Sequence, residues 1–299
     1  MQPARPPDPR GGAARANSVC GPVDFGRAAR SLSGMFPIRD HNPSRSTPWV
    51  TWAIIAVNAA VFLSYAGGLD DPRVIYPLWD RWALIPAEVS SGLDYHTVLT
   101  SMFLHGGWMH VIGNMLFLWV FGDNMEDEFG HLGFLGFYLA AGAAAAVLHV
   151  MSDPASAIPT VGASGAIAGV MGGYLLLFPK AKVDVLFIIV ILIRIIPIPA
   201  WVVLGVWFAI QFASGAMTPT EAGGVAYWAH VGGFAAGVVL TLPLFLRRGG
   251  PRFWNRSHGH PPHPAAVYSQ SRVPVVPKQT PPLPNDPVRP GSPWQRSRR

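Results

Sequence analysis

Cysteine and charged residues are what this chain of 299 residues has least of. Cys20 is its only cysteine, which excludes an intramolecular disulfide framework. Charged residues make up 13% of the chain, against about 25% in soluble domains, and 50% of the residues are apolar. The composition is therefore that of a membrane protein.

Polar residues are concentrated at the two ends of the chain. Residues 1–47 are rich in Pro and Arg, and the Pro-rich residues 249–299 cannot bury enough surface to order themselves. Residues 48–248 are a succession of apolar runs, with spans expected at about 49–66, 106–122, 132–150, 164–178, 198–213 and 225–246. The apolar stretch 183–197, which contains Arg194 and Pro197, is expected to be interfacial or re-entrant. We predict an all-α polytopic membrane protein with a six-helix membrane domain at 48–248, a large first loop and disordered cytoplasmic tails at 1–47 and 249–299.

The positions of Lys and Arg predict the orientation. Seven lie in the N-terminal tail and ten at the C-terminal end, and Lys180 and Lys182 follow the fourth span, whereas the first loop holds only Arg73 and Arg81. By the positive-inside rule both termini are cytoplasmic. The formal charge of +6 follows from these tails. A nucleic-acid partner would need a basic folded domain, and the sequence has none.

Targeting signals are weak. No apolar core of a secretory signal is evident near residue 10, and the Arg-rich first 40 residues only loosely resemble a mitochondrial transit peptide, because prolines at 3, 6, 7 and 9 oppose an amphipathic helix. A bacterial inner membrane is the expected location, with an organelle membrane as the alternative.

Ser164 opens the fourth apolar segment, which ends at Phe178 and has a length of roughly 22 Å as a helix. Because the hydrocarbon core is about 30 Å thick, the Ser164 end is expected to lie below the membrane surface. Backbone groups there must line a protein-enclosed or watered cavity. A nucleophilic side chain at this depth is a functional candidate.

His230 in the last span lies at a matching depth. Ser164 is about 24 Å above Lys180 along a helix, and His230 is about 26 Å above Arg247. Small residues at four-residue spacing, Gly165/Gly169/Gly173 and Ala229/Gly233/Gly237, allow the two helices to approach closely. The sequence therefore predicts a direct contact between Ser164 and His230.

His110 and Asn114 in the second span share one helix face. His110 is about 20 Å above Asp123, which also places it near the depth of Ser164. Polar donors beside a nucleophile are what a developing oxyanion needs. The simpler alternative is that they are interhelical hydrogen-bond contacts.

Together these residues resemble the rhomboid family of intramembrane serine proteases. The resemblance covers about 49–247 and rests on H-G-G-W-M-H-V-I-G-N at 105–114, G-A-S-G at 162–165 and A-H-V-G-G-F-A-A-G at 229–237, with G-D-N-M-E-D-E-F-G at 122–130. The combination of motifs in this order is specific, whereas a single G-x-S-G would not be.

The resemblance implies a function and a set of roles. Ser164 would be the nucleophile and His230 the general base of a dyad, and His110 and Asn114 would complete the oxyanion site with the Ser164 backbone N–H. Structural support would come from His105, Glu126, Gly162, Gly233 and Gly237. The expected reaction is cleavage of transmembrane protein substrates, with the active site open to the non-cytoplasmic side.

Two positions depart from the family pattern. Tyr95-His96 occupies the place of the frequent Trp-Arg pair of the first loop, and Ala168 replaces a frequent aromatic residue four positions after the nucleophile. His230 must therefore be oriented in another way. The first-loop aromatics Trp79 and Trp82, with Tyr95 and Trp108, fit either a loop embedded in the outer leaflet or a plain aromatic belt.

Other functions are less well supported. An inactive relative that binds membrane clients would have lost Ser164 or His230, and a transporter would show inverted repeats, which the sequence lacks. No metal or other cofactor is expected, because H-E-x-x-H is absent and His105 and His110 are not spaced as a zinc pair. His258, His260 and His263 could chelate a metal, but solvated tail residues are the simpler interpretation. The expected partners are transmembrane substrates and the lipid bilayer.

Overall fold

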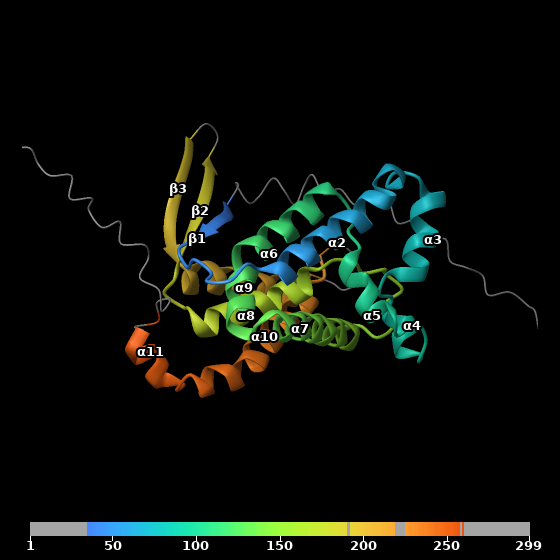
Figure 1. The fold of residues 1–299 in the computed structure, drawn as a ribbon. Helices are drawn as coiled ribbons and strands as arrows, with labels where there is room; N and C mark the ends of the chain where they lie inside the picture. The colour runs from blue at the N-terminus through green and yellow to red at the C-terminus, as the bar shows by residue number, and fades with distance from the viewer. Residues whose placement is uncertain (1–34, 190–191, 219–224, 258, 260–299) are drawn as a thin grey trace, which may run out of the picture. The chain divides into compact units, whose positions relative to one another are not determined.

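The computed structural model describes residues 35–189, 192–218, 225–257 and 259. The chain divides into two compact units, Met1–His263 and Pro264–Arg299, and every described residue belongs to the first. This first unit is mostly helical (Figure 1).

Each of the six apolar runs forms a helix. Their bounds are α2 Trp49–Tyr65, α6 Trp108–Phe129, α7 His131–Ser152, α8 Ser164–Leu177, α9 Ala200–Met217 and α10 Tyr227–Arg247. Among the described residues, four helices are long and apolar enough to cross a membrane: α2 with the turn after it, α7, α9 and α10. Helix α8 is apolar but has only 14 residues, and α6 ends in the acidic sequence E-D-E.

Helix α8 is the core of the bundle. Nearly all of its residues between Gly165 and Leu177 are buried, and it packs against α10, α7, α6 and α9. Figure 1 shows it in the middle of the helices. Its glycine-rich sequence presents backbone to its neighbours, so the surrounding helices approach closely.

The predicted large first loop is present and contains short helices. These are η1 Ala66–Gly68, α3 Pro72–Trp82, α4 Pro86–Ser90, α5 Thr97–Thr100 and η2 Ser101–Phe103. The loop is tied to the segment that leads into α8, because Leu84 and Thr160 exchange backbone hydrogen bonds of 3.0 and 2.8 Å. The Gly162 N–H also donates to the Ser101 carbonyl at 2.9 Å. The loop therefore positions the residues that precede Ser164.

The prediction of an all-α protein was wrong for one part of the chain. The strands β1 Met35–Asp40, β2 Lys182–Ile189 and β3 Leu192–Pro199 form an antiparallel sheet in the order β1-β2-β3. Most of the stretch 183–197, which was expected to be interfacial or re-entrant, thus lies in two antiparallel strands. Its β-branched residues favour strands, and Pro197 is tolerated because β3 is an edge strand.

The tail boundaries also differ from the prediction. Residues 35–40 of the expected N-terminal tail form β1, and the Asn124 side chain holds the Asn42 carbonyl at 2.6 Å. On the other side, α11 Pro251–Ser257 occupies the start of the segment predicted to be disordered. Phe253 of α11 is buried and meets Phe245, which explains why this part is ordered. The rest of both tails lies outside the described residues.

Candidate active site

Ser164 and His230 lie in direct hydrogen-bond contact. Ser164 is the first residue of α8, and His230 lies in the first turn of α10. The distance between Ser164 Oγ and His230 Nε2 is 2.8 Å. The two helices are the most extensively packed pair in the described chain, so this contact is held by the bundle core. A serine hydroxyl bonded to an imidazole nitrogen is the arrangement that activates a nucleophile.

A glycine keeps the space beside this pair open. Gly162 has φ +133°, a conformation that other residues rarely adopt. A Cβ at this position would lie 2.8 Å from His110 Nε2 and 3.5 Å from Ser164 Oγ. The absent side chain therefore leaves room between His110 and Ser164, which is where a bound carbonyl group would need to enter.

His110 presents a donor to this space. Its Nδ1 accepts the Gly106 N–H over 3.4 Å. A neutral imidazole has one donor nitrogen and one acceptor nitrogen. With Nδ1 as the acceptor, Nε2 carries the proton and faces Gly162.

Asn114 lies one turn further along α6 and has an unused donor. The side chain is buried, with 8% exposed, and its Nδ2 has no hydrogen-bond partner among the described residues. A buried donor left without a partner is costly and requires an explanation. An incoming anionic oxygen would provide the missing acceptor.

His105 lies between His110 and the Tyr65 hydroxyl. It is fully buried, and its ring lies 5.1 Å from that of His110 in an edge-on arrangement. Its backbone is held by Tyr65, which accepts the His105 N–H at 2.7 Å and donates to the His105 carbonyl at 3.0 Å. The residue thereby fixes the start of α6 against α2.

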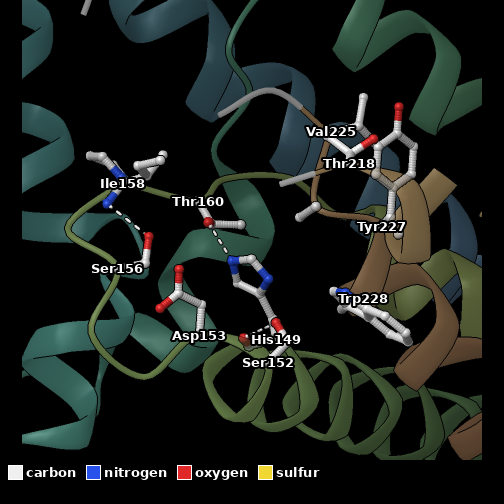
Figure 2. Close-up of a pocket in the computed structure, with 13 residues that line it drawn as sticks. His149, Ser152, Asp153, Ser156, Ile158, Thr160, Thr218, Val225, Tyr227 and Trp228 are labelled. Atoms are coloured by element: carbon white, nitrogen blue, oxygen red, sulfur yellow. Dashed lines mark hydrogen bonds between the residues drawn. The ribbon is translucent and has the colours of Figure 1, made fainter. Parts of the chain in front are cut away.

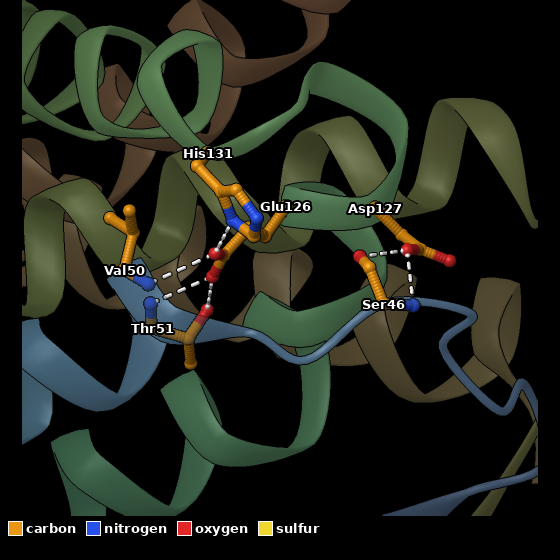
Figure 3. A network of polar contacts seen from close by, with 6 residues as sticks. All are labelled: Ser46, Val50, Thr51, Glu126, Asp127 and His131. Atoms are coloured by element: carbon orange, nitrogen blue, oxygen red, sulfur yellow. Dashed lines mark hydrogen bonds and ion pairs between the residues drawn. The ribbon is translucent and has the colours of Figure 1, made fainter.

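The other predicted support residues make contacts between helices. Gly233 and Gly237 of α10 pack directly on the backbone of α8. Glu126 lies near the far end of α6, where its carboxylate accepts the N–H groups of Val50 and Thr51 at 2.9 and 2.7 Å and also binds His131 (Figure 3). Glu126 therefore caps the N-terminus of α2 and connects it to α7.

The sequence analysis missed two residues that contact His230. Gln211 Oε1 lies 2.7 Å from His230 Nδ1, and the Trp207 ring lies 5.7 Å from the His230 ring. Both belong to α9. A single amide in an otherwise apolar span was the available signal for Gln211.

The two departures from the family pattern have structural counterparts. Ala168 is fully buried and offers no ring to His230, whereas Trp207 does. In the first loop, His96 bonds the Arg81 carbonyl at 3.0 Å and meets the Trp82 ring edge-on. Tyr95 is largely exposed.

A pocket opens where the segments before both residues of the pair meet. The segment before Ser164 lines the pocket with residues 158–160, and the segment before His230 lines it with residues 225–228 (Figure 2). Its empty volume is about 580 Å³, including the part open to the surroundings. His149 lies at its base and bonds Thr160 Oγ1 at 2.8 Å.

Metal binding has no structural support in the described ranges, where no three His, Cys, Asp or Glu side chains gather at a possible metal site. His258, His260 and His263, the possible chelating residues of the C-terminal tail, lie outside these ranges.

Comparison with known protein sequences identifies a family. Residues 93–247 match the rhomboid domain. The chain is 33% identical to the rhomboid-like protein 11, chloroplastic, of Arabidopsis thaliana over 69% of this chain and 68% of that protein. It is 34% identical to the rhomboid protease GluP of Bacillus subtilis over 66% of this chain and 36% of that protein. The match to the mitochondrial rhomboid protein 1 of Saccharomyces cerevisiae is 30% identical over 64% and 51% of the two chains.

The chain spans about half the length of several curated relatives that it matches, with coverage of 55%, 51% and 46% in three of them. The range that matches the rhomboid domain, 93–247, contains α6 to α10 and both residues of the serine–histidine pair. The described fold, its apolar helices and these matches lead to one conclusion: the chain is a membrane protein of the rhomboid family.

Proposed function

We propose that this protein is an intramembrane serine endopeptidase that uses Ser164 and His230 as a catalytic dyad. The observation that carries the proposal is the 2.8 Å contact between Ser164 Oγ and His230 Nε2 at the start of α8. The short length of α8, about 21 Å, supports a position of this contact below the membrane surface.

In the proposed reaction His230 Nε2 takes the hydroxyl proton while Ser164 Oγ attacks the carbonyl carbon of the scissile peptide bond. The negative oxygen of the tetrahedral intermediate receives hydrogen bonds from the Ser164 backbone N–H, His110 Nε2 and Asn114 Nδ2. His230 then protonates the leaving amine, and the C–N bond breaks. A water molecule, deprotonated by His230, releases the acyl group from Ser164.

The proposed membrane arrangement has six spans, with α6 and α8 crossing together with the four longer apolar helices. Both termini are cytoplasmic and the pocket of Figure 2 opens to the opposite side, as the Lys and Arg distribution favours. The membrane we propose is a bacterial inner membrane. Labelling of Cys20, the only cysteine, with a membrane-impermeant maleimide tests the sidedness. Cys20 should react in inside-out vesicles only, and equal reaction in right-side-out vesicles contradicts the arrangement.

The proposed substrates are transmembrane proteins whose helices unwind easily. A helix with all of its backbone hydrogen bonds made presents no accessible carbonyl group to Ser164. A substrate helix containing Gly should therefore be cleaved faster than a poly-Leu helix. Equal rates on the two helices would contradict this proposal.

A fluorophosphonate probe in detergent tests the dyad without a known substrate. Wild type should become covalently labelled at Ser164, as located by mass spectrometry, and His230→Asn should lose the label. Labelling that persists in His230→Asn would show that His230 does not activate Ser164. A relative that only binds membrane clients, the alternative function, would bind a transmembrane peptide without labelling or cleavage.

A further inference from the structure

The imidazole of His230 is held at both nitrogens. Its Nε2 lies 2.8 Å from Ser164 Oγ, and its Nδ1 lies 2.7 Å from Gln211 Oε1. The carbonyl oxygen of an amide can only accept a hydrogen bond. Nδ1 must then carry the single proton of the neutral ring, and Nε2 presents its lone pair to the serine hydroxyl.

We propose that Gln211 is a positioning residue that holds His230 in the tautomer able to accept the proton of Ser164. The catalytic consequence rests on the function proposed above, whereas the effect on the tautomer does not. In the wrong tautomer Nε2 would carry the proton and could not act as a base.

The position of Gln211 is itself well defined. Its side chain is buried, with 9% of the residue exposed, and it lies in the 18-residue helix α9. Trp207 is four residues earlier and thus on the same helix face. Its ring lies 5.7 Å from the His230 ring, with 34° between the two planes. Helix α9 therefore supplies both a hydrogen bond to the edge of the ring and an aromatic contact to its face.

Gln211 and Trp207 orient the His230 ring, a role that an aromatic residue at position 168 would otherwise have. Ala168 in α8 has only a methyl group and is fully buried. The side chain that orients His230 comes from α9 instead. Since α9 also packs against α8, the ring is confined between the two helices.

An amide suits this position because it orients the ring without placing a charge in the bundle. A buried carboxylate would have to be desolvated. Among the described residues, the titratable groups that act on His230 are the histidines His110 of α6 and His149 of α7, and no carboxylate is among them. The imidazolium formed during the reaction therefore has a dipole, not a counter-charge, at Nδ1.

Three variants test the proposal. Gln211→Leu keeps the approximate size and removes the acceptor, and kcat should fall about tenfold to a hundredfold with little change in KM. Gln211→Glu restores an acceptor and adds a negative charge that favours the imidazolium. It should recover most of kcat at high pH, and the acid limb of its pH–rate profile should move to higher pH. Thr241→Val in α10 is the matched control. The Thr241 hydroxyl is buried and has no hydrogen-bond partner among the described residues, so this variant should leave kcat and KM unchanged.

Nitrogen-15 NMR of histidine-labelled protein reads the tautomer directly, with His230 assigned by its absence in His230→Asn. Wild type should show protonated Nδ1 and unprotonated Nε2 for His230 at neutral pH. In Gln211→Leu the signal should change to the Nε2-protonated form or to a mixture. The spectrum also reports whether each variant is folded.

The proposal is overturned if Gln211→Leu retains the wild-type tautomer and kcat. It is also overturned if Gln211→Glu is as inactive as Gln211→Leu and its pH–rate profile does not move, because a purely structural role would give that result. Failure of the proposed function is a separate outcome: cleavage would then persist in Ser164→Ala, while the NMR result would still decide the role of Gln211.

Discussion

Gly237 of α10 lies so close to Gly169 of α8 that a Cβ on Gly237 would overlap the Gly169 carbonyl oxygen. Four residues earlier, Gly233 meets the carbonyl of Gly165 in the same way. These contacts set the distance between the helices that carry His230 and Ser164. Because backbone atoms meet at these contacts, no side chain can relieve an overlap by changing its rotamer.

Gly237→Ala should therefore destabilise the protein by about 1–3 kcal/mol or more, because the added methyl group has no space and separates α8 from α10. Unfolding in mixed detergent micelles measures the effect, and kcat should also fall. Gly136→Ala in α7 is the matched control, since a Cβ there meets nothing within 4 Å. The control should be neutral or up to about 1 kcal/mol more stable, because Ala favours the helix. Equal stability of the two variants would contradict the close packing described.

Glu126 anchors the N-terminus of α2 with a fully buried carboxylate. Glu126→Ala leaves the N–H groups of Val50 and Thr51 without an acceptor and should cost about 2–4 kcal/mol. At temperatures well below unfolding, kcat should be retained, because Glu126 is about 24 Å from His110 along α6. Asp127→Ala removes exposed hydrogen bonds to Arg45 and Ser46 and should cost less than about 1 kcal/mol. A larger loss in Asp127→Ala than in Glu126→Ala would refute this account.

Asp40 in β1 should make stability depend on pH. Burial raises the pKa of its carboxyl from 3.8 to about 7, although the Tyr174 hydroxyl donates a hydrogen bond of 2.7 Å to it. Between about pH 4 and 7 the unfolded chain has lost this proton while the folded protein keeps it, so stability falls as the pH rises through this window and then levels off. Thermal unfolding in detergent from pH 4 to 8 measures the fall.

Asp40→Asn keeps an acceptor for Tyr174 and cannot ionise. It should weaken the pH dependence and be more stable than wild type at pH 8. Asp70→Asn, at an exposed carboxyl, is the control and should follow the wild-type curve. A wild-type pH dependence in Asp40→Asn would show that Asp40 is not its source.

His110 and Asn114 should contribute to the transition state and little to substrate binding. Replacing either residue by Ala should lower kcat by about a hundredfold to a thousandfold with a small change in KM, because each removes one donor to the oxyanion. Steady-state cleavage of a transmembrane substrate measures both parameters, with Thr241→Val as the control. A rise in KM at unchanged kcat would assign these side chains to binding instead.

The helix positions and the contact between Ser164 and His230 could be predicted because both follow from local properties. The number of residues in an apolar run can be read from the sequence, and a helix rises by a constant amount per residue. The structure places Ser164 and His230 in contact, while their catalytic roles stay proposals. His110 and Asn114 could likewise be placed on one face from their spacing alone.

The sheet and Gln211 could not be predicted because they depend on relationships between distant segments. The largely apolar run at 182–199 is compatible with either a helix or a strand, and its hydropathy does not distinguish between them. Its pairing with Met35–Asp40 joins residues that are between 143 (Asp40 and Val183) and 152 (Met35 and Phe187) positions apart. Gln211 contacts His230 only because α9 packs on α10 with a particular rotation, which the sequence of α9 alone does not reveal.

Cleavage of a Gly-containing transmembrane substrate in liposomes by wild type and by Ser164→Ala tests the central claim most directly. The account predicts cleavage within or near the substrate's membrane span by wild type and none by Ser164→Ala, with both proteins equally stable in thermal unfolding. Cleavage by Ser164→Ala at the wild-type rate would contradict the proposed serine mechanism.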